Sequence, residues 1–377
     1  MLIARRILYP ALLCALLFAG RAWAAEETIR LGVVGAYSGN LAPYGIGMLN
    51  AAQAVVERAN AAGGIAGGKK LELLPHDDQC DPDKAYNAAN TLVNAGVKVV
   101  IGHLCTSATQ SALNVYNRAK IISISPSSSL PELTTSGKNP YFFRTVAMDD
   151  SQARLAAQCL EKNLKVTKAA ILHDKSDYGM GYAEFVRKQL NRNRSVKVTL
   201  FSGIDPKAND YTTILKLVRA SGAEALVFGG YDPEAVKLVS QMRELEMDIP
   251  LISLDGIKSK NFINMAGPAA EGVYASAPRE VMGNRVSKNA TEDHQKAFGD
   301  DAPLSPFYME AYAAVLAAIN AMDKSGGDQN TQKLAAVLRN EYVNTPLGRI
   351  RFNRSGDAEG VGFVMFKVID GKFMEIK

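Results

Sequence analysis

The sequence has little of the residues that most often build metal and nucleophilic sites. Its 377 residues include four His, four Cys and one Trp. No His or Cys stands at the spacing of a metal site, and the acidic segment 77–83 lacks the Gly and the closing Glu of an EF-hand loop. Asp81 before Pro82 is instead typical of a helix N-cap. We therefore expect neither a metal nor a cofactor.

Long hydrophobic runs and a basic excess are also absent from the part of the chain that we expect to fold. An apolar run over 7–19 follows two arginines and leads to the small-x-small pattern A-W-A, which predicts a secretory signal peptide over 1–24. That segment holds three arginines and no acid, so its removal lowers the formal charge from +5 to +2. No later run is long enough to span a bilayer. The sequence thus predicts an exported protein with no basic surface for nucleic acids.

What is present is a regular alternation of apolar, β-rich runs with stretches of helical periodicity. This alternation predicts parallel sheets that helices cover on both faces. It runs twice, over about 26–147 and about 148–278, and no long linker separates the two series. We expect an α/β protein of two doubly wound lobes joined by short crossing segments that act as a hinge. The expected strands lie at 28–36, 70–78, 97–104, 121–126, 168–174, 195–204, 224–230, 250–256 and 272–278, with later helices near 304–323 and 329–340 and closing strands at 347–353 and 360–369.

Polar residues gather where the expected strands end, which is where open α/β sheets bind ligands. The loop 126–129 offers serine hydroxyls and free backbone N–H groups that suit a carboxylate, although a plain loop or a helix start has the same composition. Asp255 follows a buried strand and needs a partner, which is either a ligand ammonium or a nearby lysine, Lys258 or Lys260. Phenol rings after strands either wall a cleft or simply pack, and they belong to Tyr44, Tyr178 and Tyr231.

The stretch 101–109, IGHLCTSAT, places a His two residues before a Cys. In a strand, His103 and Cys105 point to the same face, so a nucleophile with its base is geometrically possible. Cys80 lies just after the adjacent expected strand, and an exported protein meets an oxidising compartment. These facts favour a disulfide between Cys80 and Cys105, which leaves Cys159 over, and they favour a structural role for His103.

Seven segments occur in a specific order along the chain: IRLGVVGAYSGNLAPYG, DDQCDPDKA, VIGHLCTSATQ, ISPSSSLPEL, HDKSDYGMG, FGGYDPE and SLDGI. Together they resemble the periplasmic leucine/isoleucine/valine-binding proteins of branched-chain amino acid ABC transporters, from about Thr28 to the C-terminus. The resemblance implies a type I periplasmic binding fold with three crossings between the lobes. It also implies lobe limits of 26–147 plus 279–361 for one lobe and 148–278 plus 362–377 for the other.

The same resemblance implies a set of site residues. The cysteine pair of the family corresponds to Cys80 and Cys105. Its contacts to the ligand carboxylate correspond to Thr106, Ser127 and Ser129. Its ammonium-binding acid corresponds to Asp255, where the best-known members have a Glu that is one methylene longer. The expected side-chain pocket falls on Tyr44, Leu104, Tyr178, Tyr231 and Phe307.

The function that follows is capture of an amino acid, Leu, Ile or Val, without chemistry. We expect a monomer that closes around its ligand and delivers it to an ABC permease in the membrane. Two alternatives remain. One is a binding or sensor protein of the same fold for another ligand, such as an amide or an aromatic acid. The other is a hydrolase that uses Cys105 with His103.

Overall fold

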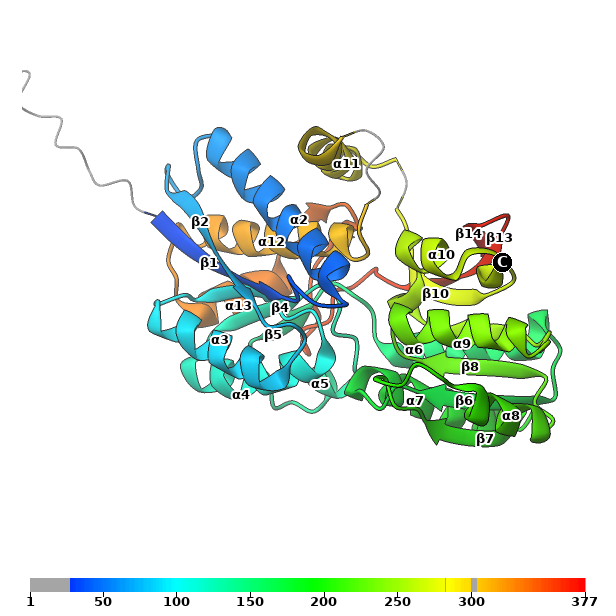
Figure 1. Ribbon diagram of the computed structural model, residues 1–377. Helices are drawn as coiled ribbons and strands as arrows, with labels where there is room; N and C mark the ends of the chain where they lie inside the picture. The colour runs from blue at the N-terminus through cyan, green and yellow to red at the C-terminus, as the bar shows by residue number, and fades with distance from the viewer. Residues whose placement is uncertain (1–27, 282, 300–303, 377) are drawn as a thin grey trace, which may run out of the picture.

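The computed structural model describes residues 28–281, 283–299 and 304–376. Within them the chain forms two α/β lobes that lie side by side (Figure 1). We call the part built on a five-stranded sheet the first lobe and the part built on a seven-stranded sheet the second lobe. The expected signal peptide, 1–24, lies outside the described residues. The predicted class, α/β with two doubly wound lobes, is confirmed.

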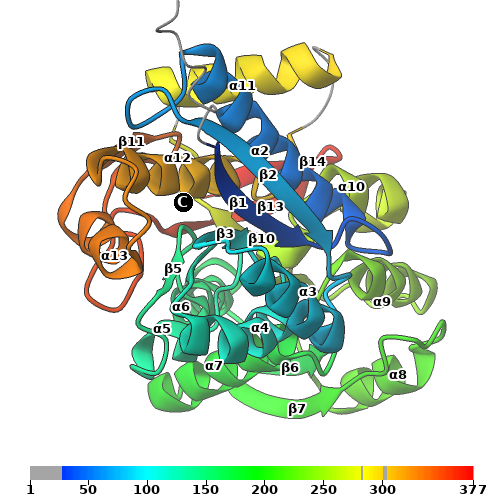
Figure 2. The same ribbon diagram turned by 90° about the vertical axis from the view of Figure 1, so that its left-hand side faces the viewer.

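The first lobe has a parallel sheet in the order β2-β1-β3-β4-β5. Every position of β3 (Val99–Gly102) and β4 (Ile122–Ser125) is buried, because helices cover both faces of the sheet (Figure 2). Side chains of α2 and α12 (Tyr308–Lys324) pack on one face, and side chains of α3 and α4 pack on the other. The remaining elements are β1 (Thr28–Gly35), α2 (Ala42–Ala61), β2 (Lys70–Asp77), α3 (Pro82–Asn94), α4 (Thr106–Ala119), α5 (Glu132–Thr135) and β5 (Phe142–Arg144).

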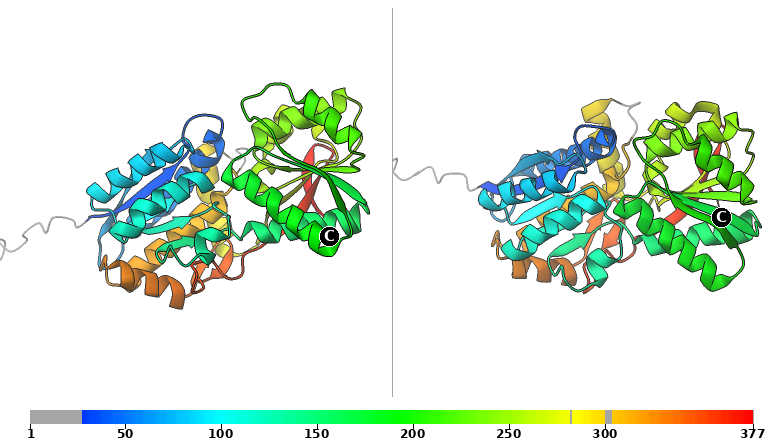
Figure 3. Two further views of the ribbon diagram at one scale, coloured as in Figure 1. Left: turned by 90° about the horizontal axis from the view of Figure 1, so that it is seen from below. Right: turned by 60° about the horizontal axis from the view of Figure 1, so that its bottom comes forward.

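The second lobe has a sheet in the order β14-β13-β10-β9-β8-β6-β7. Its two C-terminal strands are antiparallel additions, drawn in red beside the green and yellow strands (Figure 3). Separate apolar clusters fill the two faces, one under α6 and α7 and the other under α8, α9 and α10. The elements before the return of the chain are α6 (Asp149–Gln158), β6 (Lys168–His173), α7 (Asp177–Asn193), β7 (Lys197–Gly203), α8 (Thr212–Ala220), β8 (Ala225–Gly229), α9 (Asp232–Glu244), β9 (Leu251–Ser253), α10 (Lys260–Ala266) and β10 (Tyr274–Pro278).

The chain passes between the lobes three times. It crosses after β5, crosses back after β10, and crosses again before β13, so that its last two strands join the second lobe (Figure 1). Several short connections working together allow a hinge motion rather than free tumbling. The elements after β10 are α11 (Arg285–Phe298), α12, α13 (Thr331–Asn340), β11 (Val343–Thr345), β12 (Gly348–Ile350), β13 (Phe363–Ile369) and β14 (Lys372–Ile376).

Several predicted elements are shorter in the structure, such as β9 and β12, and two of the changed limits have a local steric reason. The strand expected over 97–104 ends at Gly102, whose φ is +129° and whose position would bring an added Cβ to 2.2 Å from the Val34 carbonyl oxygen. The helix expected from 304 begins only at Tyr308, because Phe307 has a left-handed φ of 62°. Three short strands and one polar helix were not predicted: β5, β11, β14 and α11.

None of the helices in the described part combines the length and the apolar composition that crossing a bilayer requires.

Candidate functional site

A small closed pocket lies between the lobes, at the carboxyl ends of strands from both sheets. Its volume is about 20 Å³, which holds about one water molecule. An amino acid is larger, so the lobes must part before one can enter. The lining residues are Leu41, Tyr44, Leu104, Cys105, Thr106, Ser127, Tyr178, Tyr231, Gly256 and Phe307. Seven of the residues predicted from sequence are thus brought together here, whereas Ser129 and Asp255 are not on the surface of the pocket.

The first lobe contributes hydroxyl groups that are held by backbone contacts. Thr106 is the first residue of α4, so the unpaired N–H groups of that helix face the same region. Ser127 Oγ donates a hydrogen bond to the Leu104 carbonyl at 2.6 Å. The expectation of successive free N–H groups after Pro126 is wrong, because the N–H groups of Ser127 and Ser128 both donate to Ser125 Oγ, at 3.3 and 2.9 Å.

The predicted disulfide between Cys80 and Cys105 is present and fixes this edge. Its Cα atoms are 5.4 Å apart, within the usual range for a bridge. Cys105 directly precedes α4, and Asp81 caps α3 by accepting from the Asp83 and Lys84 N–H groups at 2.9 Å, as the sequence predicts. The disulfide therefore ties together the starts of two helices at the pocket.

His103 is a structural residue in the described chain. Because the strand ends at Gly102, the expectation that His103 and Cys105 share one strand face is wrong. The His103 ring lies between Asp78, with Nδ1 2.7 Å from Oδ2, and the Tyr116 hydroxyl, 3.0 Å from Nε2. All three side chains are buried. With its sulfur bridged, Cys105 has no thiolate to act as a nucleophile, so the hydrolase alternative lacks its central group.

The second lobe contributes two stacked phenol rings. Tyr178 and Tyr231 have ring centroids 4.9 Å apart and an interplanar angle of 27°. The Tyr178 hydroxyl donates to Asp255 Oδ1 at 2.5 Å and accepts from the Gly256 N–H at 2.9 Å. Burial, reinforced by the nearby Asp255 carboxylate, raises the pKa of Tyr178 well above its usual value. Both rings therefore stay neutral and present an apolar face with a polar tip.

Two contacts join the lobes across the pocket. The Tyr44 hydroxyl of the first lobe donates to the Gly256 carbonyl of the second at 2.9 Å. The Tyr231 hydroxyl of the second lobe lies 3.6 Å from Cys105 Sγ of the first. Phe307 completes the wall beside Tyr44, with ring centroids 6.4 Å apart. The pocket is consequently closed by groups that must separate when the lobes open.

Asp255 lies behind the pocket rather than on its surface. It is 2% exposed, and Tyr178 and Gln152 donate to its Oδ1. Lys258, one of the two lysines expected as a possible partner of Asp255, instead pairs with Glu280 at 3.0 Å. Burial raises the pKa of Asp255 to about 6. A ligand ammonium would reach this carboxylate only beside or past the Tyr178 hydroxyl.

The sequence analysis did not predict three polar residues that lie near Asp255. Gln152 Nε2 donates to both Asp255 Oδ1 and Asp149 Oδ1, each at 3.0 Å. Burial and then the Asp255 charge raise the pKa of Asp149 to about 7, and burial raises that of Glu310 to about 7. A signal was available, because Asp149 and Gln152 share the buried face of α6 with alanines. Polar residues on an apolar helix face indicate a function or a network.

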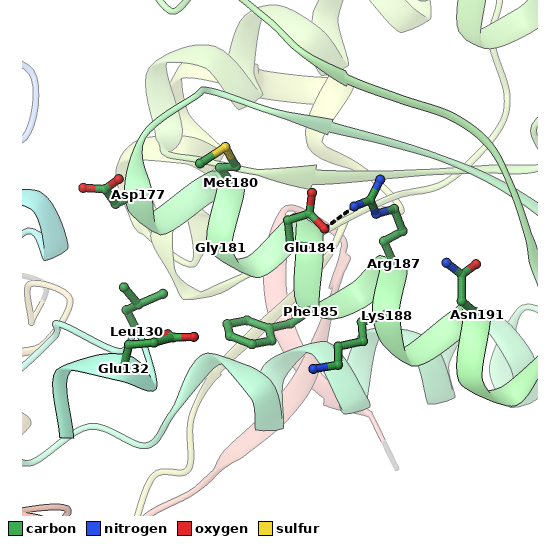
Figure 4. A pocket seen from close by; sticks show the side chains of 10 residues that line it. All are labelled: Leu130, Glu132, Asp177, Met180, Gly181, Glu184, Phe185, Arg187, Lys188 and Asn191. Carbon is green, nitrogen blue, oxygen red and sulfur yellow. Dashed lines mark hydrogen bonds and ion pairs between the residues drawn. The ribbon is translucent and has the colours of Figure 1, made fainter. Parts of the chain in front are cut away.

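A second hollow, of about 600 Å³, lies at the outer edge of the gap between the lobes (Figure 4). It is lined mainly by α7, together with Leu130 and Glu132 of the first lobe. Two of its five charged residues, Glu184 and Arg187, pair with one another at 2.6 Å. Of the residues predicted from sequence for the site, none lines this hollow, and we regard it as an outer surface rather than the site.

The chain is similar to known binding proteins over most of its length. A family model described as periplasmic binding protein matches residues 28–371. The leucine-, isoleucine-, valine-, threonine-, and alanine-binding protein of Pseudomonas aeruginosa is 33% identical over 91% of this chain and 90% of its own length. The Leu/Ile/Val-binding protein of Escherichia coli is also 33% identical, over 91% of each chain.

Solved structures show the same fold at lower sequence identity. A leucine binding protein of Thermotoga maritima has a TM-score of 0.83 at 21% identity and covers 93% of this chain and 98% of its own. A solute binding protein of R. palustris in complex with benzoate has a TM-score of 0.82 at 17% identity and covers 93% and 96%.

Proposed function

Since this chain belongs to the periplasmic binding protein family, we propose that it captures an amino acid, Leu, Ile or Val, between its lobes and delivers it to an ABC permease in the membrane. One observation carries the proposal. Strand ends of both lobes meet in one pocket, with helix N–H groups and hydroxyls on one side and a buried carboxylate behind the other. That arrangement matches the two charged ends of an amino acid.

The ligand carboxylate belongs on the first lobe. Thr106 and Ser127 line the pocket there, and the start of α4 adds N–H groups with a favourable helix dipole. Ser129 lies deeper, with a buried Oγ that has no hydrogen-bond partner among the described residues. We assign it a supporting role behind the ligand rather than a direct contact in the closed state.

The ligand ammonium belongs on the second lobe, next to Tyr178 and Asp255. The Tyr178 oxygen keeps acceptor capacity, and the Asp255 charge behind it favours a cation. The ligand side chain then lies against apolar and aromatic walls, which suits an aliphatic group. Those walls are Tyr44, Leu104, Tyr231 and Phe307.

Capture is a closure step with no bond made or broken. We propose that 26–147 plus 279–361 and 148–278 plus 362–377 move as two rigid lobes of a monomer in the periplasm. The ligand first meets the first lobe, and only closure adds the contacts of the second, so the ligand favours the closed state. A binder that feeds a permease needs a Kd near 1 μM, about −8 kcal/mol, to capture its ligand and still release it.

A ligand screen tests this function. Purified protein is heated with each of the twenty amino acids, and hits are measured by calorimetry. We expect Leu, Ile or Val to raise the melting temperature and to bind with a Kd of about 1 μM. Failure of all three to bind would contradict the proposal.

One alternative ligand class has a specific observation behind it. The aromatic side chains of the pocket and the neighbour solved with benzoate both suit an aromatic acid. Benzoate and 4-hydroxybenzoate are therefore included in the screen. If they bind and no amino acid does, the ammonium role of Asp255 is wrong while the carboxylate role of the first lobe stands.

A further inference from the structure

Two buried carboxylates lie behind the pocket, and one amide joins them. Gln152 Nε2 lies 3.0 Å from Asp149 Oδ1 and 3.0 Å from Asp255 Oδ1. The other oxygen of each carboxylate, Oδ2, is buried and has no hydrogen-bond partner among the described residues. A buried ionised oxygen without a donor is costly. The geometry therefore disfavours full ionisation of both groups.

The donors around this pair are too few for two negative charges. Gln152 has two N–H groups to give, the Tyr178 hydroxyl gives one to Asp255, and the Ser129 hydroxyl faces Asp149 and lowers its pKa. No ion pair found in the described part of the chain includes Asp149 or Asp255. Arg144, whose charge acts on Asp149, is bound to Asp357 at 2.7 Å. Two adjacent buried carboxylates without a counter-ion ionise together only at raised pH, so one proton is held below that pH.

We propose that ligand capture is linked to this proton. The Asp149–Asp255 pair keeps one proton in the free protein and releases it to water when the ligand ammonium arrives beside Asp255. The step breaks one carboxyl O–H bond, and the ammonium keeps its own three protons. The added positive charge is what allows the second carboxylate to ionise. This inference rests on the proposed function.

Gln152 links the Asp149–Asp255 pair to segments next to the crossings between the lobes. Its Oε1 accepts from Ser276 Oγ at 2.5 Å and from the Asp255 N–H at 3.2 Å. Ser276 lies in β10, just before the second crossing, and Asp149 follows the first crossing and donates its N–H to the Ser129 carbonyl at 3.0 Å. The proton thus lies where the ligand, the second lobe and two crossings meet.

The surrounding ionisable groups agree with this linkage. Burial, together with the Asp255 charge, raises the pKa of Asp149 to about 7, so its proton is lost within the accessible pH range. The buried tyrosines have raised pKa values and stay neutral there. Glu310 is a third buried acid, and its charge, once it ionises, repels that of Asp255. The other groups whose charges act on the pair are Arg144, Tyr178, Tyr182, Tyr231 and Glu310.

Calorimetry with leucine tests the proposal. Titrations at pH 7 in phosphate and in Tris, which differ in ionisation enthalpy, count the protons released. We expect about 0.5 proton per ligand and a fall in affinity of about tenfold from pH 8 to pH 5.5, since complete linkage gives tenfold per pH unit. Binding without proton release would overturn the linkage and leave the proposed function intact.

Two variants test whether the released proton comes from Asp149. Asp149→Asn should at least halve the number of protons released and should weaken the pH dependence of the leucine affinity. Asp150→Asn, the matched control on the same helix, removes an acid that pairs with Arg154 at 2.7 Å and should leave both unchanged. An unchanged profile in Asp149→Asn would contradict the proposal.

A measurement without ligand covers the case in which Asp149→Asn folds poorly or leucine does not bind. An Asp whose pKa is raised on folding stabilises the fold less as the pH rises through that value. The melting temperature of Asp149→Asn minus that of the wild type should therefore grow from pH 5 to pH 8, and a constant difference would overturn the held proton. If no amino acid gives any heat, the proposed function fails and the linkage fails with it.

Discussion

The two sides of the pocket are built from opposite kinds of chemistry. On the first lobe the Ser127 hydroxyl on the pocket surface is engaged by the Leu104 carbonyl, and a disulfide fixes the start of the neighbouring helix. On the second lobe, carboxylate oxygens of Asp149 and Asp255 are buried without partners. The first side is a preformed, neutral surface, whereas the second side holds charge that an incoming cation would satisfy. The difference suggests an order of events, with the ligand landing on the first lobe and the second lobe gaining most from closure.

Removing the charge of the second lobe should have the largest effect on binding. Asp255→Ala deletes the carboxylate behind Tyr178, and losing a buried charged partner costs about 2–5 kcal/mol. We expect the affinity for leucine by calorimetry to fall by well over tenfold. Asp205→Ala, at an exposed acid of the same lobe, serves as the control. An affinity of Asp255→Ala equal to that of the wild type would remove Asp255 from the ammonium site.

Removing the disulfide of the first lobe should have the second-largest effect, which is a loss of stability. Cys80→Ser with Cys105→Ser opens a loop of 25 residues, and a bridge over such a loop contributes roughly 3 kcal/mol to the free energy of unfolding. Urea unfolding should show this loss. Reduction should destabilise the wild type by a similar amount and leave the double variant unchanged. If the double variant is as stable as the wild type, the disulfide is not what fixes the first-lobe side of the pocket.

Disturbing the contact between the lobes should weaken binding without touching the ligand. A Cβ added at Gly181 of α7 would lie 2.9 Å from Leu130 Cδ1 of the first lobe. Gly181→Leu should therefore hinder closure at a cost of about 1 kcal/mol or more and lower the affinity about fivefold. Leu130→Ala in the same chain should restore most of it. If the wild type, Gly181→Leu and the double variant have equal affinities, crowding at this contact does not hinder closure.

Removing one hydrogen bond across the pocket should have the smallest effect. Tyr44→Phe deletes the donor to the Gly256 carbonyl, and such a bond is worth about 1 kcal/mol. We expect about a fivefold weaker affinity for leucine by calorimetry, with no change in unfolding by urea. Tyr86→Phe, at an exposed tyrosine, should change neither quantity. A loss of a hundredfold would mean that the Tyr44 hydroxyl forms a hydrogen bond with the ligand itself.

Much of the first side could be predicted from sequence, and less of the second. Thr106 and Ser127 follow short buried strands, and the carboxyl ends of parallel strands meet at one edge, so their proximity follows from local pattern alone. Asp149 and Gln152 lie at the start of a helix, where acids are common because they complement the helix dipole. The apolar helix face that they share with alanines indicates a polar network, but nothing local places that network behind a pocket.

The sequence by itself determined the alternation of strands and helices, the hydroxyl-rich strand ends and the cysteines that bridge. These features depend on periodicity and on neighbours close in the chain, where side-chain chemistry sets the local conformation. Only the tertiary structure decided that Asp255 lies behind Tyr178 and shares Gln152 with Asp149. Gln152 and Asp255 are 103 residues apart. Their contact depends on how the crossings bring α6 against the end of β9, and no local pattern in the chain encodes that packing.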